Sequence, residues 1–225
     1  MTESLSEKRG LLLLSGGFDS PVAGRMLQRL GCDIGAVHFD QQPFTDATGE
    51  EKARALAAQL GIKELFIASA GGPFSTFANQ CHHRHYFVLM KRFMLRASER
   101  LARLHGYDFL ITGESLGQVS SQTLPNLSTI DGAVQMPVVR PLLAFDKQEI
   151  IQIARDIGTH NISVGPEHCD ALGPRYPSTH LQRADVEGDE AKVDYAALVA
   201  EAVRTVRRET PRALLTVTAT GAPKC

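Results

Sequence analysis

The sequence of 225 residues has little of several features that mark common protein classes. Its 24 lysine and arginine residues almost balance its 25 acidic residues, so the net charge of −1 gives no overall positive field for nucleic acid. Any RNA contact has to come from a local patch or from another chain. The apolar run Leu11–Leu14 is too short for a signal peptide or a membrane span, and the residues before it are polar. We therefore expect a cytoplasmic protein without membrane contact.

Cysteine is scarce and scattered. Cys32, Cys81, Cys169 and Cys225 lie far apart, with no CxxC pair and no zinc-like spacing, which excludes a metal ribbon or a cluster held by adjacent thiols. We expect these thiols to be reduced. The segment QCHHRHYF around Cys81 contains three histidines. A solvated loop is favoured there over a metal site, because no second group of ligands fixes a geometry.

The chain also lacks the GxxxxGK[ST] sequence of Walker loops, but it has another glycine-rich loop. A buried strand is predicted at Leu11–Leu14, a helix at Pro21–Leu30, and SGGFDS lies between them. The glycines let the backbone approach a phosphate, and the helix N-terminus favours negative charge. The SGGxDS order is that of enzymes that split ATP between its α- and β-phosphates. The alternative, a Gly-Gly turn with Ser20 as a helix cap, leaves the full order of residues unexplained.

Apolar β-rich runs alternate with helical patterns, which is typical of an α/β fold whose parallel sheet is covered on both faces. The predicted strands are Leu11–Leu14, Asp33–Phe39, Glu64–Ala68, Phe109–Thr112 and Val138–Arg140. The predicted helices are Pro21–Leu30, Gly49–Leu60, Phe87–Leu104, the Asp146–Ile157 helix with a capping box, and Tyr195–Arg208. Ligands bind at the carboxyl ends of parallel strands, so Ser15–Ser20, His38-Phe39 and Gly113-Glu114 are expected to share one pocket.

A second motif follows the strand predicted at 109–112. Residues 112–123 read TGESLGQVSSQT, and this density of polar groups directly after a buried strand indicates a substrate or adenosine contact surface. A plain polar surface loop is the alternative. With GGFDSPVA, VHF, KRFMLRAS, RPLLAFDKQEII, ARDIGT and PEHC, the motif resembles the tRNA sulfurtransferase family over residues 10–208. These are the ThiI-type 4-thiouridine synthases, which are also linked to sulfur supply for thiamine.

The resemblance implies a Rossmann-like adenine nucleotide alpha-hydrolase fold, also called the PP-loop fold, with ATP and Mg²⁺ as cofactors. By position in the motifs, Asp19 would hold the loop or the magnesium. The other residues that the resemblance assigns to the nucleotide are Leu13 and Leu14 beside it, Ser15, Gly16, Gly17 and Ser20 around the pyrophosphate, His38 and Phe39 at the adenine, Lys91 at a phosphate, and Gly113 and Gln122 completing the site.

The resemblance also implies the reaction. A tRNA uridine is adenylated at O4 with release of pyrophosphate, and a cysteine persulfide then attacks C4. Cys169, in PEHC, occupies the position of the persulfide-bearing cysteine of the family. From the residues alone, a passive loop thiol is the alternative for Cys169. Cys225 is a candidate second thiol, on a terminal segment of the kind that usually tolerates change.

The division that we expect is a tail at residues 1–9, a PP-loop thiolation domain at 10–180, and a C-terminal helical extension and tail at 181–225. Full-length members of the family carry an RNA-binding module before the catalytic domain, and some carry a rhodanese-like domain behind it. The expected partners are therefore tRNA with a separate RNA-binding subunit, and a sulfur donor such as a cysteine desulfurase or rhodanese-like protein. A homodimer is an open alternative.

Other interpretations stay open for one helix and for the reaction. The basic run at 91–103 has helical spacing, and we expect Lys91 to be functional and the later arginines to be solvated or paired within the chain. A PP-loop ATP pyrophosphatase that adenylates a small molecule is the alternative enzyme. A non-catalytic nucleotide-binding remnant would have no need of intact SGGFDS and TGESLGQVSSQT motifs.

Overall fold

Strands β1 to β6 form one sheet in the computed structural model, which describes residues 5–165 and 171–211. The order across the sheet is β5-β4-β1-β2-β3-β6. The first five strands run parallel, and β6 pairs antiparallel with β3. The bounds are Arg9–Leu13 for β1, Asp33–Asp40 for β2, Leu65–Ser69 for β3, Phe109–Ile111 for β4, Val138–Val139 for β5 and Arg207–Glu209 for β6. The predicted parallel sheet is confirmed.

The helices are α1 (Asp19–Arg29), α2 (Thr48–Gln59), α3 (Gly71–Gln80), α4 (Tyr86–His105), α5 (Leu124–Asp131), α6 (Lys147–Asp156), α7 (His160–Ser163), α8 (Arg183–Glu190) and α9 (Tyr195–Arg204), with 3₁₀ turns at Leu5–Glu7 and His83–His85. Helix α1 begins inside the glycine-rich motif, two residues before the predicted start. Sequence patterns missed α3, α5, α7 and α8, which are short. The helix predicted at Tyr195–Arg208 is wrong in its last turn, because the chain leaves α9 and joins the sheet edge as β6.

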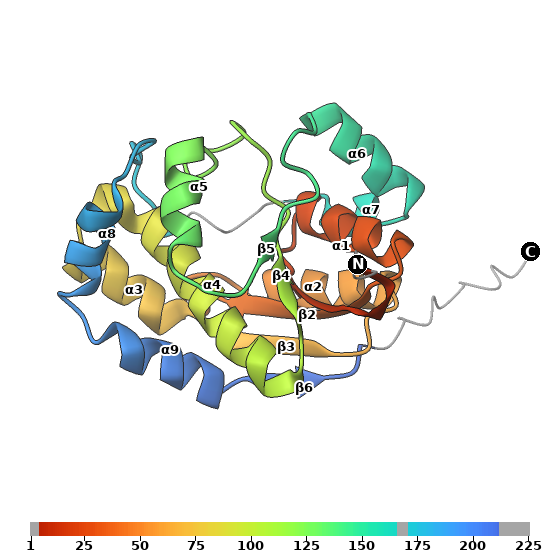
Figure 1. Cartoon of the computed structure of the whole chain (residues 1–225), viewed down its shortest axis with the longest axis horizontal. Helices are drawn as coiled ribbons and strands as arrows, with labels where there is room; N and C mark the ends of the chain where they lie inside the picture. Colours follow the sequence, from red (N-terminus) through yellow and green to blue (C-terminus); the bar gives the residue numbers. More distant parts are fainter. Residues whose placement is uncertain (1–4, 166–170, 212–225) are drawn as a thin grey trace, which may run out of the picture.

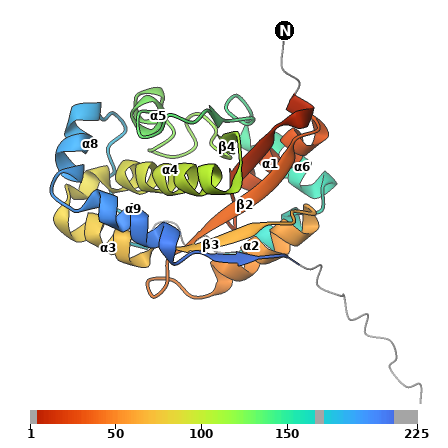
Figure 2. The same cartoon turned by 60° about the horizontal axis from the view of Figure 1, so that its bottom comes forward.

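The apolar side chains of each strand point alternately to the two faces of the sheet, which divides the core into two layers. Leu11 of β1 packs with α3, α4, α5 and α9 on one face, whereas its neighbour Leu12 packs with α1, α2 and α6 on the other. Successive side chains of a strand point to opposite faces, so two fully buried leucines serve both layers. Figures 1 and 2 show α1 and α6 on one side of the sheet and α3, α4 and α9 on the other. None of the helices in the described segments is both long enough and apolar enough to span a membrane.

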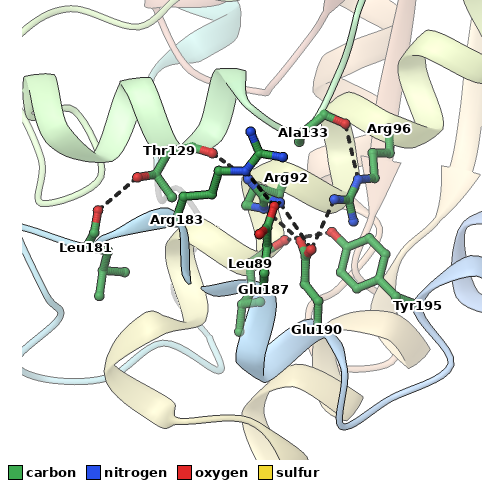
Figure 3. A network of polar contacts seen from close by, with 10 residues as sticks. All are labelled: Leu89, Arg92, Arg96, Thr129, Ala133, Leu181, Arg183, Glu187, Glu190 and Tyr195. Atoms are coloured by element: carbon green, nitrogen blue, oxygen red, sulfur yellow. Dashed lines mark hydrogen bonds and ion pairs between the residues drawn. The ribbon is translucent and has the colours of Figure 1, made fainter. Parts of the chain in front are cut away.

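A buried arginine joins α4 to the helices that cover it. Arg92 is 0 % exposed, and its guanidinium donates to Glu190 of α8 at 2.7 and 3.1 Å and to the Thr129 carbonyl of α5 at 2.5 Å. Arg96 reaches the same carboxylate at 3.0 Å (Figure 3). The expectation of intramolecular pairing holds for both arginines. The alternative prediction of a solvated helix face is wrong at Arg92, because α5 and α8 pack over that part of α4.

The histidine-rich segment is also more ordered than predicted. His83–His85 forms a 3₁₀ turn, and His85 Nδ1 lies 2.7 Å from the buried carboxylate of Asp189 in α8. The Cys81 thiol donates to the Asp189 carbonyl at 3.6 Å. The prediction of a solvated loop holds for His82, His83 and Arg84, which are exposed, whereas Cys81 and His85 are half-buried against α8. Among the residues that the structure describes, no group of three histidine, cysteine or acidic side chains is arranged to hold a metal ion.

Candidate functional site

A cavity of about 860 Å³ opens at the carboxyl ends of β1, β2 and β4. The chain runs from β1 to β2 and β3 in one direction, then crosses back to β4 on the other side of β1. The cavity therefore lies at the switch point where α/β sheets bind ligands. Its wall includes every predicted nucleotide residue: Leu13, Leu14, Ser15, Gly16, Gly17, Asp19, Ser20, His38, Phe39, Lys91, Gly113 and Gln122. Cys169 and Cys225 lie outside the described residues.

The phosphate loop, residues 15–20, is held by its own hydroxyl groups. Ser20 Oγ accepts from the Ser15 backbone N–H at 2.9 Å and lies 3.0 Å from Ser15 Oγ, which in turn accepts from the Gly17 N–H at 3.2 Å. The N-cap residue Phe18 makes no side-chain cap, so the first N–H groups of α1 have no side-chain acceptor from it. Ser20 thus closes the loop and is not the helix cap that the alternative interpretation required. An uncapped helix N-terminus at a cavity favours an anion.

The two sequence motifs meet at Gly113. A Cβ atom at this position would lie 2.5 Å from the Ser20 nitrogen and 2.6 Å from the Asp19 carbonyl carbon. Such distances leave no room for a side chain, so glycine lets the segment after β4 rest against the first turn of α1. This contact brings the TGESLGQVSSQT segment beside the phosphate loop.

His38 and Phe39 end β2 at the cavity wall. His38 Nδ1 lies 2.9 Å from the Leu14 carbonyl oxygen, and the ring is buried. Burial lowers the pKa of His38, so the neutral imidazole donates from Nδ1 and leaves Nε2 as an acceptor. The Phe39 ring packs edge-on against Phe93 at 6.2 Å between centroids. These contacts make a rigid boundary with one available acceptor.

A buried carboxylate holds Lys91. Glu114, directly after Gly113, lies 3.0 Å from Lys91 Nζ and accepts from Arg140 Nε at 2.7 Å. The Thr112 hydroxyl donates to the same carboxylate at 3.0 Å. Burial alone would raise the pKa of Glu114, but Lys91 and Arg140 lower it to about 2. The group is thus ionised at neutral pH and pairs with two cations, of which Lys91 lines the cavity.

Arg140 was predicted only as the end of a strand, and its role could not be read from the sequence. Its guanidinium also pairs with Asp131 of α5 through two bonds of 3.1 and 2.6 Å. Asp131 precedes Arg140 by nine positions, and the intervening segment has no regular periodicity. The pairing depends on where α5 packs, which no local pattern reveals.

Lys147, the first residue of α6, was also not predicted as a site residue. Its Nζ lies 2.8 Å from Asp19 Oδ1 and 3.5 Å from Gln118 Oε1, at the cavity wall. The capping box of Asp146 and Glu149 predicted the start of α6 correctly. It gave no sign that the next side chain reaches the phosphate loop, 128 residues away in the chain.

Two buried amide atoms at the cavity have no hydrogen-bond partner among the residues that the structure describes. These are Gln122 Oε1, an acceptor, and Gln118 Nε2, a donor. Leaving a buried polar atom unpaired costs about 1–3 kcal/mol, so a ligand that satisfies both atoms would gain from doing so. Polar atoms of both kinds in one cavity suit a nucleotide better than a purely apolar molecule.

The segment at 171–181 closes another part of the wall with Gly173, Pro174, Arg175 and Pro177. Asn126 of α5 anchors it from inside. Its Nδ2 donates to the carbonyls of Ser120 at 2.8 Å and Ser178 at 3.0 Å, and its Oδ1 accepts from the Leu181 N–H at 3.0 Å. A single buried amide therefore ties the TGESLGQVSSQT segment to this wall. No pattern in the sequence distinguishes Asn126 from a surface residue of the polar run.

A magnesium ion fits the cavity only in part. Asp19 supplies a carboxylate at the phosphate loop, but no group of three metal-binding side chains surrounds it within the described residues. Mg²⁺ commonly takes one or two carboxylates and completes its shell with phosphate oxygens and water. Asp19 would be its protein ligand on that basis, and the ion would depend on bound phosphates for the remainder.

Comparisons with known proteins give a consistent result. A sequence model described as thiamine biosynthesis protein (ThiI) matches residues 5–195. A probable tRNA sulfurtransferase of Finegoldia magna is 40% identical over 204 residues, which are 88% of this chain and 52% of that protein. Another, of Nocardia farcinica, is 43% identical over 209 residues, 90% of this chain and 51% of that protein. This chain thus spans about half the length of these curated relatives.

Solved structures agree with the fold. A 4-thiouridine synthetase in a complex with RNA and bound ATP superposes with a TM-score of 0.86 at 34% identity, covering 91% of this chain and 55% of that one. NMN synthetase from Francisella tularensis has a TM-score of 0.54 at 17% identity and covers 88% and 81% of the two chains. The second likeness shows the fold alone. The predicted Rossmann-like PP-loop fold is confirmed.

Proposed function

The chain belongs to the ThiI family, and from this premise we propose that it is the ATP-dependent catalytic part of a tRNA sulfurtransferase that forms 4-thiouridine. The observation that carries the proposal is the contact of Gly113 with the first turn of α1. It joins the phosphate loop to the TGESLGQVSSQT segment around one cavity, so that nucleotide and acceptor groups would have adjoining walls.

The proposed first step is transfer of AMP. The uridine O4 attacks the α-phosphorus of ATP as the base loses its N3 proton, and pyrophosphate leaves with the electron pair of the broken P–O bond. The N–H groups of the phosphate loop and the Lys91 ammonium would stabilise negative charge on the phosphates. The neutral His38 and the apolar Phe39 would border the adenine. Mg²⁺, with Asp19 as its protein ligand, would neutralise part of the phosphate charge.

The proposed second step is sulfur transfer. The terminal sulfur of a persulfide on Cys169 bonds to C4, and AMP leaves. A second thiol then attacks the cysteine sulfur, which releases 4-thiouridine and leaves a disulfide for an external reductant. A cysteine desulfurase or rhodanese-like protein would load the persulfide, and a separate RNA-binding subunit would hold the tRNA. A homodimer is an alternative way of presenting the RNA.

The test measures the amount of 4-thiouridine in the tRNA of the host. Deleting this gene is expected to remove 4-thiouridine from bulk tRNA, measured by mass spectrometry of nucleosides, and the intact gene restores it. Unchanged 4-thiouridine in a strain with no second synthase would contradict the tRNA assignment. The Cys169→Ser variant separates the two enzyme alternatives, because it should keep pyrophosphate release and lose thiolation. A pyrophosphatase acting on a small molecule would be little affected by that change.

Asp19→Ala provides a second arm of the same test. We expect this variant to fold normally and to release no pyrophosphate from ATP in the presence of tRNA. Glu201→Ala is a matched control, because this carboxylate is exposed on α9 and pairs with its neighbour Arg204. Full activity of Asp19→Ala would remove the assignment of the phosphate loop.

A further inference from the structure

We propose that Arg175 and Tyr176 bind single-stranded RNA at the mouth of the cavity, with a phosphate on the guanidinium and a base stacked on the tyrosine ring. This inference rests on the proposed function, which brings a tRNA uridine into the cavity. It names the surface that receives the RNA next to that uridine. Both residues belong to the segment at 171–181, outside the SGGFDS and TGESLGQVSSQT motifs.

Arg175 lies where the cavity meets the surface of the protein. It lines the cavity wall and is also an exposed residue. Val119 lines the same wall and is 54% exposed. The two segments adjoin, because the Asn126 amide nitrogen donates to the carbonyls of both Ser120 and Ser178. Residues 119–120 and 175–178 therefore form one edge of the mouth.

The Tyr176 side chain is open to solvent on a fixed backbone. Tyr176 is 69% exposed and is not part of the cavity wall, so its ring lies outside the mouth. Its carbonyl accepts from Arg84 Nε at 3.2 Å, and the Ser178 N–H donates to the Arg84 carbonyl at 3.0 Å. The 3₁₀ turn at His83–His85 thus holds this part of the edge. A base can stack on a ring held in this way with little loss of conformational freedom.

The guanidinium groups at this edge have donors to spare. Within residues 5–165 and 171–211, the Arg175 guanidinium makes no hydrogen bond or ion pair, and it lies 5.3 Å from the centre of the Tyr176 ring. In the same part of the chain, neither Arg175 nor Arg84 pairs with a carboxylate. Because an arginine carries five N–H donors, a phosphate can bind here without breaking an ion pair.

The basic run of α4 is used within the protein instead. Arg92, Arg96 and Arg103 each pair with a glutamate. The chain has a net charge of −1, so it needs local cations to attract a polyanion. Arg84 and Arg175 supply such cations beside the cavity. Charge complementarity therefore favours RNA as the occupant of this edge.

The arrangement suits an RNA whose target base enters the cavity. A base that leaves its stack to reach an active site also leaves a neighbouring base without a stacking partner. Proteins that bind single strands replace such partners with aromatic side chains and hold the backbone with cations. Tyr176, outside the mouth, would carry the neighbouring base. Arg175, at the mouth, would meet the phosphate between the two nucleotides.

The first experiment measures the base stack. Fluorescence anisotropy follows the binding of a labelled, uridine-containing single-stranded RNA to the full chain at about 50 mM salt. We expect Tyr176→Ala to bind roughly tenfold more weakly, as for the loss of one base stack, and Tyr176→Phe to stay within about twofold of the wild type. Leu104→Ala is the matched control and should bind normally, because Leu104 is 66% exposed on α4 and does not line the cavity.

The second experiment measures the phosphate contact through salt. The same titration is repeated between about 50 and 200 mM salt with Arg175→Ala. We expect the slope of log affinity against log salt to become shallower by about 0.7, the value for one phosphate of a single strand. Arg175→Lys should keep the slope of the wild type. Arg204→Ala is the control, because Arg204 is an exposed arginine of α9 that does not line the cavity.

The outcomes decide between RNA and other ligands. RNA affinity that is unchanged in Tyr176→Ala, or an unchanged salt slope in Arg175→Ala, overturns the proposal, and a protein partner would then be the occupant to consider. Binding by the wild type that is too weak to measure at about 50 mM salt also overturns it. So does an equal loss of ATP affinity and RNA affinity in either variant, since this would indicate a nucleotide contact or a structural role.

The proposal can fail or stand independently of the function on which it rests. If RNA binding depends on Arg175 and Tyr176 while the host keeps its 4-thiouridine after gene deletion, the RNA site stands and the assignment of thiolation fails. If deletion removes 4-thiouridine while both alanine variants bind RNA like the wild type, the proposed function stands and the RNA site fails.

Discussion

Lys91 and Glu114 form an ion pair of 3.0 Å at the cavity wall, and the carboxylate in this pair is buried. Arg140 binds the other oxygen of Glu114 and continues to Asp131 of α5. The pair therefore connects the long helix α4 to the segment after β4 and to α5. It fixes a positive side chain in the wall of the cavity that the phosphate loop also lines, without leaving the carboxylate uncompensated. The arrangement gives a direct link between stability and the geometry of the site.

Replacing Glu114 with Gln tests that link through pH. Lys91 and Arg140 overcome the effect of burial and lower the pKa of Glu114 from 4.5 to about 2. Its stabilisation is therefore full above pH 4.5 and is lost as the pH falls toward 2. We expect the free energy of unfolding of Glu114→Gln to be about 3 kcal/mol lower than that of the wild type at neutral pH. We also expect this free energy to fall less steeply in the variant as the pH is lowered. Urea titrations across this pH range measure both effects.

The control for this prediction is Glu201→Gln, which removes an exposed carboxylate paired within α9. Exposed pairs are screened by solvent and contribute little. Equal acid sensitivity of the wild type and Glu114→Gln would contradict the prediction.

Gly113→Ala tests the contact between the two motifs. The added Cβ would meet the Ser20 nitrogen at 2.5 Å, so the first turn of α1 has to move. We expect ATP affinity to fall roughly tenfold or more, because displaced backbone N–H groups no longer point at the phosphates. Calorimetric titration with ATP measures the change. Gly72→Ala in α3 is the matched control, since nothing lies within 4 Å of its added Cβ. Normal ATP affinity in Gly113→Ala would show that the contact is dispensable.

Arg92→Met removes the buried guanidinium that joins α4, α5 and α8. The change leaves Glu190 with Arg96 as its remaining cation and leaves the Thr129 carbonyl without its donor. We expect the free energy of unfolding to fall by about 3–5 kcal/mol, as for other broken buried pairs. Chemical denaturation followed by circular dichroism is the measurement. Arg103→Met, at an exposed pair on the same helix, should change stability little, and similar losses for both variants would count against a special role for the network.

His38→Gln tests the neutral state of the buried histidine. Burial lowers the pKa of His38 from 6.5 in the folded protein, so below about pH 6.5 the unfolded chain binds the proton first. Wild-type stability should therefore fall as the pH falls from 7 to 5, and the variant should show a smaller fall. His180→Gln is the control, because His180 is exposed. The same pH slope in the wild type and His38→Gln would show that folding does not lower the pKa of His38.

The sequence predicted the central part of the fold from local patterns. Apolar runs such as Leu11–Leu14 end in turn residues and are followed by helical spacing, and each of these signals acts within a few residues. The capping box at Asp146 and Glu149 likewise fixed the start of α6 within one residue. The short helices α5 and α8 were not predicted, because they contain few residues with helical periodicity and are stabilised mainly by tertiary packing.

The nucleotide residues were predicted by motif, and the cavity brings all those in the described segments together. The partners of these residues were not predicted. Lys147 meets Asp19 across 128 residues, and Glu190 meets Arg92 across 98. A charged side chain at helical spacing looks the same in a sequence whether it faces water or a buried carboxylate.

By itself the sequence determined the five parallel strands, the loop that carries the anion-binding glycines, and the family that the motifs resemble. Hydrophobic periodicity and turn chemistry act locally, so a linear pattern preserves them. Only the tertiary structure decided that Lys147 stands at the phosphate loop, that Glu114 holds Lys91, and that Arg92 is buried. Those relationships depend on how helices from distant parts of the chain pack on the sheet, because ion pairs form where packing brings charges together.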